Sequence, residues 1–141
     1  MKTLLLIDPG EANRQLVSAL FSYSDVSVQA ATTIREGVDA ALRDSPDLIV
    51  TEFMVPERGG QCVIDALNRH EALKEIPVIV WAAEGIGDAR TRTEQRGSRF
   101  VPKSSPPLVL VQAVLSAMEL RKPARKAPDV LAGAVEDPTA A

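Results

Sequence analysis

The sequence of 141 residues has one cysteine, no apolar run of membrane length and no excess of basic residues. The single cysteine, Cys62, excludes an internal disulfide bond and fits a reducing compartment. The N-terminal apolar run Leu4–Ile7 is too short for a secretion signal or a membrane span. With a net charge of −3, a nucleic-acid-binding surface is not expected either. We therefore expect a cytoplasmic protein whose partners are neither nucleic acids nor membranes.

Apolar runs alternate with segments of helical periodicity along the first 120 residues. This alternation predicts a doubly wound α/β fold, with a parallel sheet covered by helices on both faces. The expected strands are Thr3–Ile7, Val26–Ala30, Leu48–Thr51, Val78–Trp81 and Arg99–Val101. The expected helices are Glu11–Tyr23, Ile34–Arg43, Gln61–His70, Asp88–Arg96 and Leu108–Leu120. In the first helix the apolar residues at helical spacing are Ala12, Leu16, Ala19, Leu20 and Tyr23.

The strand patterns also predict the order of the sheet. The first, third and fourth runs are continuously apolar, as expected for strands with helices on both faces. The second run alternates, and the fifth is short and ends at Pro102, so both are expected at the edges. This gives the order 2-1-3-4-5 of flavodoxin-like folds, in which ligands bind at the carboxyl ends of the first and third strands. Asp8 and Glu52 follow those two strands.

The composition changes after residue 120. Residues 121–141 are rich in alanine and proline, with a basic start and a mildly acidic end. We interpret residues 1–120 as one domain and residues 121–141 as a disordered tail.

Four separated segments resemble the receiver domain of bacterial response regulators (CheY-like), over roughly residues 2–120. Leu4–Asp8 is similar to the first strand of the family and its acidic end. Pro46–Pro56, with the glycines at 59 and 60, is similar to the third strand and the turn that carries the phospho-acceptor. Pro77–Ala83 resembles the fourth strand, and Phe100–Lys103 resembles the segment with the switch aromatic and the lysine.

The resemblance assigns a phospho-acceptor pocket to this chain, and three of its positions depart from the family pattern. Pro9 stands where the family has a second acid, Glu52 where it has the acceptor aspartate, and Ala82 where it has a serine or threonine. The residues that carry over one by one are Asp8, Lys103 and the switch aromatic Phe100.

These departures weaken the chemistry of phosphoryl transfer, which requires in-line placement and charge neutralisation, normally by Mg²⁺. Two carboxylates and one lysine leave a pocket charge of −1, and a proline replaces one oxygen ligand. Glu52 is one methylene longer than aspartate, and a misplacement of about 1 Å can cost on the order of 10²-fold in rate. Ala82 cannot hydrogen-bond a phosphoryl oxygen. We expect no enzyme activity and no cofactor, with at most weak Mg²⁺ binding by Asp8 and Glu52.

Two pocket residues have alternative interpretations. Glu52 is expected to form a structural ion pair with Lys103, and the alternative is a built-in mimic of phosphoaspartate. Asp8 is expected to be the N-cap of the first helix, with Pro9 at N1 and Glu11 at N3, in preference to a metal ligand.

The predicted function is that of a stand-alone pseudo-receiver, which acts in a signalling pathway by phosphorylation-independent protein–protein interaction. The last helix is apolar around more of its circumference than one packed face requires, which favours a protein partner or a homodimer there. One alternative is a regulator that is still phosphorylated, or constitutively active through Glu52; another is a module that binds a small molecule or an anion. The candidate interface residues are Arg90, Arg92, Arg96, Arg99, Leu110 and Val114. For the four arginines, a solvated face is favoured over contact with an acidic partner.

Overall fold

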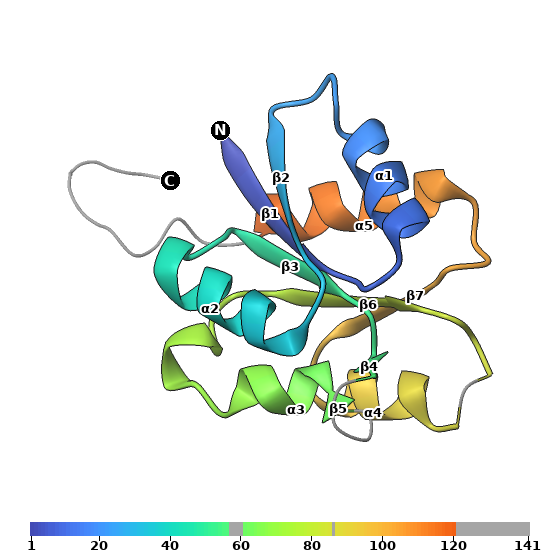
Figure 1. Cartoon of the computed structure of the whole chain (residues 1–141). Helices are drawn as coiled ribbons and strands as arrows, with labels where there is room; N and C mark the ends of the chain where they lie inside the picture. Colours follow the sequence, from blue (N-terminus) through green and yellow to red (C-terminus); the bar gives the residue numbers. More distant parts are fainter. Residues whose placement is uncertain (57–60, 86, 121–141) are drawn as a thin grey trace.

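The computed structural model describes residues 1–56, 61–85 and 87–120 and contains a five-stranded parallel sheet (Figure 1). The strands lie in the order β2-β1-β3-β6-β7. Because β6 and β7 are the fourth and fifth strands of this sheet along the chain, the predicted order 2-1-3-4-5 is confirmed. The strand bounds are Lys2–Ile7 for β1, Val26–Ala31 for β2, Leu48–Thr51 for β3, Val78–Ala82 for β6 and Arg99–Pro102 for β7.

Helices cover both faces of the sheet, as predicted (Figure 1). One face packs against α1 and α5, and the other against α2, α3 and α4. The helix bounds are Glu11–Leu20 for α1, Ile34–Asp44 for α2, Val63–Asn68 for α3, Ala89–Gln95 for α4 and Pro107–Leu120 for α5, and a 3₁₀ turn spans Glu71–Leu73.

The burial of the interior strand β1 on both faces explains its continuous apolar run Leu4–Ile7. Leu4 and Leu6 lie in the core beneath α1 and α5, whereas Leu5 and Ile7 lie in the core beneath α2 and α3. Successive side chains of a strand point to opposite faces, so a strand covered on both sides requires apolar residues at every position. Because the last four residues of β1 are buried, the carboxyl end of the strand is held in place, and with it the next residue, Asp8.

Gly37 brings α2 close to this end of β1. A Cβ atom at Gly37 would lie 2.5 Å from Ile7 Cδ1, so a larger residue would push the helix away from the strand. The start of α2 is capped by Thr33, whose side chain accepts a hydrogen bond from the Glu36 amide at 3.0 Å.

The predicted helix Gln61–His70 is wrong at both ends. Gln61–Cys62 forms the short strand β5, which pairs antiparallel with β4 at Met54–Val55, and α3 begins only at Val63. The backbone of Cys62 is extended because it takes part in this pairing. The antiparallel pair β4–β5 therefore stands between β3 and α3 along the chain.

The first helix also differs from its expected pattern. It ends at Leu20, and its buried contacts come from Val17 within it and Phe21 just after it. Leu16 and Tyr23 are exposed instead. The proposed tail lies outside the described residues. Within residues 1–56, 61–85 and 87–120, no helix has the length and apolar character needed to cross a membrane.

Candidate functional site

Three charged side chains meet at the carboxyl edge of the sheet. Asp8 follows β1, Glu52 follows β3 and Lys103 follows β7. Lys103 Nζ lies 2.8 Å from Asp8 Oδ2 and 2.6 Å from Glu52 Oε1. The predicted ion pair between Glu52 and Lys103 is confirmed, and the lysine also bridges to Asp8. We call Asp8, Glu52 and Lys103 the Lys103 cluster.

Asp8 is the most buried member of the Lys103 cluster, with 1% of its surface exposed. Its Oδ1 accepts hydrogen bonds from the Gly10 amide at 2.8 Å and from the Asn13 side-chain amide at 3.2 Å. Its other carboxylate oxygen faces the lysine. The carboxylate therefore holds the turn after β1 and balances the Lys103 charge.

The prediction that Asp8 caps the first helix is wrong. The N-cap is Gly10, which has extended backbone angles and no side-chain cap, and α1 begins at Glu11. Pro9 lies in the turn before the helix rather than at its first position. Asp8 is two residues too early to cap the helix, and its oxygens are engaged by Gly10, Asn13 and Lys103.

The Lys103 ammonium is stabilised in its charged form. Burial lowers the pKa of Lys103, but the hydrogen bonds that its ammonium donates to Asp8 and Glu52, together with the charges of both carboxylates, outweigh this effect, so the pKa lies above its ordinary value. The ammonium also lies 5.0 Å from the centre of the Trp81 ring. Its backbone N–H donates to the Ala82 carbonyl at 2.8 Å, which anchors the residue to the end of β6.

The residues of this site do not fit a divalent cation. Mg²⁺ requires near-octahedral oxygen coordination, and the lysine ammonium stands between the two available carboxylates. In the part of the chain that the structure describes, no group of three His, Cys, Asp or Glu side chains could hold a metal ion. Lys103 places a positive charge between the two carboxylates.

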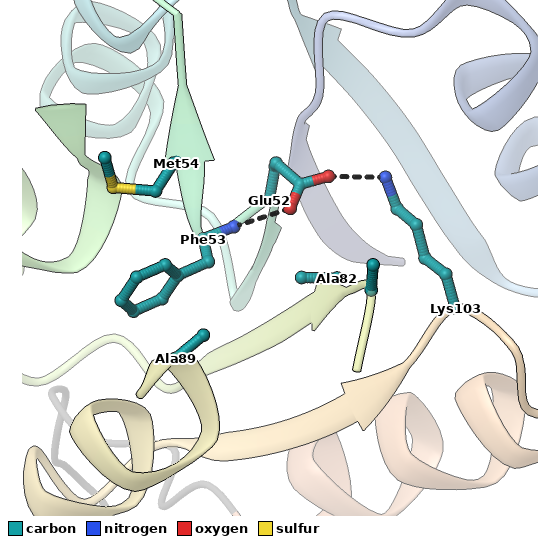
Figure 2. A pocket seen from close by; sticks show the side chains of 7 residues that line it. Glu52, Phe53, Met54, Ala82, Ala89 and Lys103 are labelled. Carbon is teal, nitrogen blue, oxygen red and sulfur yellow. Dashed lines mark hydrogen bonds and ion pairs between the residues drawn. The ribbon is translucent and has the colours of Figure 1, made fainter. Parts of the chain in front are cut away.

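Glu52 forms one wall of a pocket beside the Lys103 cluster (Figure 2). Its second oxygen, Oε2, accepts a hydrogen bond from the Phe53 amide at 3.0 Å, so both carboxylate oxygens have partners. The pocket has a volume of about 320 Å³. Its lining residues are Glu52, Phe53, Met54, Ala82, Ala83, Ala89 and Lys103. Because Ala82 has no polar side-chain atom, the end of β6 offers no hydroxyl to a phosphoryl group.

The switch-aromatic position Phe100 is buried, with 6% of its surface exposed. The Arg90 guanidinium lies 4.8 Å from the centre of its ring. Arg90 in turn pairs with Glu84 at 2.7 Å and with Glu94 at 3.5 Å. The aromatic side chain is thus enclosed by α4 and covered by an ion-paired arginine.

Arg92 of α4 and Arg96, the C-cap residue of that helix, bind the same acid on α3. Arg92 and Arg96 lie 3.0 Å and 2.5 Å from the Asp65 carboxylate, and Arg92 also lies 5.3 Å from the centre of the Phe53 ring. Arg99 is exposed on β7. Sequence reasoning missed Asp65, although the spacing of Arg92 and Arg96 places both on one helix face. We call these contacts, with those of Arg90, the α4 arginine pairs.

The candidate interface residues Leu110 and Val114 are in the core, which corrects that prediction. Their exposures are 2% and 0%, because they lie on the face of α5 that packs against the sheet. The exposed large apolar residues of α5 are Leu108, at 61%, and Leu115, at 47%. An α5 interface would therefore have to use the outer side of the helix.

Sequence comparison identifies relatives over most of the chain. The sequence profile of the response regulator receiver domain matches residues 4–115. The hybrid signal transduction histidine kinase D of Dictyostelium discoideum is 31% identical over 120 residues, which are 84% of this chain and 8% of the kinase. The response regulator PleD of Caulobacter vibrioides is 30% identical over 114 residues, which are 80% of this chain and 25% of PleD. The polar-differentiation response regulator DivK of Brucella ovis is 29% identical over 96 residues, covering 68% of this chain and 78% of DivK.

Solved structures share the fold. The receiver domain of the Francisella response regulator 1452 superposes with a TM-score of 0.75 at 19% identity, covering 86% of this chain and all of that one (100%). The non-phosphorylated HemR receiver domain of Leptospira biflexa gives a TM-score of 0.75 at 19% identity, with coverages of 89% and 100%.

Proposed function

This chain belongs to the response regulator receiver domain family of two-component signalling, and we propose that it is a pseudo-receiver. In this proposal it interacts with protein partners in a signalling pathway without accepting a phosphoryl group. It is a binding domain rather than an enzyme. Its full-length relatives reach further than this chain, which spans 8% of the Dictyostelium kinase and 25% of PleD.

The observation that carries the proposal is the position of the Lys103 ammonium. It lies within 2.8 Å of both carboxylates, where a phosphoryl-transfer site would need a divalent cation. The Glu52 carboxylate is also engaged on both oxygens, by Lys103 and by the Phe53 amide. These contacts draw electron density from both oxygens and weaken Glu52 as a nucleophile, and its attack would proceed without a metal to neutralise the developing charge.

Support for a single fixed conformation comes from the other side of the pocket. Ala82 has no hydroxyl that could respond to a phosphoryl group, and Phe100 is already buried beneath Arg90. The α4 arginine pairs join α4 to α3 and to the loop before α4. We infer that protein partners bind the surface of this domain in this single conformation.

Intact mass after incubation with acetyl phosphate and Mg²⁺ tests the proposal. We expect no phosphoryl adduct on the wild-type chain. The matched positive control is the triple variant Pro9→Asp, Glu52→Asp and Ala82→Thr, which restores the second acid, the acceptor length and the hydroxyl. A stable adduct on the wild-type chain would refute the pseudo-receiver function.

Mimicry of phosphoaspartate by Glu52 is the second candidate, because the carboxylate reaches Lys103. It predicts that partner binding is lost in Glu52→Gln and retained when the acceptor is phosphorylated in the triple variant. The structural ion pair predicts that Glu52→Gln lowers stability and leaves partner binding intact in the folded fraction.

For the partner surface, we propose the outer side of α5, where Leu108 and Leu115 are exposed. Light scattering of the wild-type chain and of Leu115→Asp tests whether a homodimer forms there. Because Leu115 is 47% exposed, this variant should remain folded, whereas a charge at the buried Val114 should unfold the domain. A wild-type monomer, with partner binding unchanged in Leu115→Asp, would exclude this surface.

A further inference from the structure

The pocket beside Glu52 combines apolar walls with one accessible carboxylate. Ala82, Ala83 and Ala89, which have no atoms beyond Cβ, line the pocket together with Phe53 and Met54. Figure 2 shows Ala82, Ala89, Phe53 and Met54 around it. The volume of about 320 Å³ is at the small end of ligand pockets, which span roughly 300–1,000 Å³. The pocket therefore suits a small ligand with an apolar body.

The charge of the site favours a cationic head group. Asp8 and Glu52 against Lys103 leave one excess negative charge. Glu52 is 21% exposed, and each of its oxygens has a second lone pair beyond the contact already made. Asp8 is only 1% exposed and cannot be reached from outside. Glu52 is thus the group that a ligand would meet.

Nearby arginines do not cancel this excess charge. Arg92 covers the Phe53 ring, but it pairs with Asp65 at 3.0 Å. Arg90 pairs with Glu84 at 2.7 Å. Each of these cations has its own acid outside the pocket, so neither provides a free site for an anion.

We propose that this pocket binds an alkylammonium group. The ammonium donates to Glu52 Oε2, and the alkyl chain lies among the three alanines, Phe53 and Met54. The group comes either from a free amine or from the lysine side chain of a partner protein. The proposal rests on the pocket alone and does not depend on whether the domain accepts phosphate.

NMR titration of the ¹⁵N-labelled full chain tests the proposal, with n-butylammonium as the probe and 1-butanol, butyrate and inorganic phosphate as comparisons. We expect n-butylammonium to shift the amide signals of Phe53 and Ala83 and to bind more tightly than the neutral and anionic compounds. Glu52→Gln should weaken its binding about tenfold, because a charge-assisted hydrogen bond is lost.

A filling variant tests the position of the alkyl chain. Ala83 is exposed at the pocket mouth, so Ala83→Leu should fold and weaken n-butylammonium about tenfold. The matched control is Ala12→Leu, at an exposed position of α1, which should leave the affinity unchanged. Equal binding of 1-butanol, preferred binding of butyrate or phosphate, or unchanged affinity in Ala83→Leu would overturn the proposal.

The two sources of the ammonium are distinguished by a second probe, Nα-acetyl-lysine methylamide. Binding at least as tight as that of n-butylammonium assigns the pocket to a lysine of a partner protein. Binding of n-butylammonium alone assigns it to a free amine. If neither probe shifts the Phe53 and Ala83 signals, the proposal is refuted, whatever the mass experiment finds about phosphorylation.

Discussion

The Lys103 cluster and the α4 arginine pairs are both built from ion pairs, but they differ in burial. In the Lys103 cluster the lysine and Glu52 are each 21% exposed and Asp8 is 1% exposed. The side chains of the α4 arginine pairs are between 33% and 57% exposed. Water screens the second group and competes for its hydrogen bonds, whereas the first has few alternative partners. Similar distances are therefore expected to contribute different free energies of unfolding, with the larger contribution from the more buried Lys103 cluster.

The largest expected effect is that of Lys103→Met, which leaves the buried Asp8 side chain without its partner. Loss of one partner of a buried ion pair costs about 3 kcal/mol, at the low end of the usual range because Lys103 is partly exposed. Urea unfolding of the variant and of the wild type measures the difference in the free energy of unfolding.

The matched control is Lys74→Met. Lys74 pairs with Glu71 at 3.2 Å, and the two side chains are 51% and 90% exposed. The same substitution there should change the free energy of unfolding by about 0.5 kcal/mol or less. A similar loss in both variants would contradict the distinction between buried and exposed pairs.

The second prediction concerns alkaline pH. The pKa of Lys103 is raised in the folded state above the ordinary value of 10.5, so the folded state holds the proton more tightly than the unfolded state. The stabilisation is fully present below pH 10.5 and is lost as the pH rises through the higher pKa of the folded state.

Urea unfolding of wild type and Lys103→Met between pH about 8 and about 12 measures this loss, which is part of the roughly 3 kcal/mol above. The difference between the two proteins should be constant at the lower pH values and shrink above 10.5. Groups that titrate alike in both proteins cancel in this difference. A difference that grows with pH would contradict the raised pKa.

The sheet and the ion pair within it could be predicted because they depend on short local patterns. Strand Leu48–Thr51 has the predicted bounds, since a run buried on both faces contrasts sharply with its polar neighbours. Once the strand order is known, the ends of β3 and β7 fall on one edge of the sheet. The pairing of Glu52 with Lys103 follows from that placement.

The features that could not be predicted depend on the exact position of a helix cap or on which face of a helix packs against the sheet. In α1 two apolar stripes compete, and packing against the sheet buries Val17 while leaving Leu16 exposed. The prediction for Asp8 failed because Gly10, and not Asp8, is the N-cap of the helix that begins at Glu11. Val114 belongs to an almost wholly apolar helix, whose sequence alone does not show which side faces the core.

The smallest expected effect is that of Asp65→Asn, which removes the carboxylate shared by Arg92 and Arg96. Both pairs are partly exposed, so the loss should be about 1 kcal/mol in dilute buffer. This loss in the free energy of unfolding should be smaller in about 1 M NaCl than in dilute buffer, because charges are screened beyond about 3 Å there. Urea unfolding at both salt concentrations measures this dependence, and the effect of Lys103→Met should change much less because Asp8 is buried. If salt weakened both effects equally, the contrast between the two ion-pair groups would fail, and the Lys103 cluster would be no better shielded from solvent than the surface of α4.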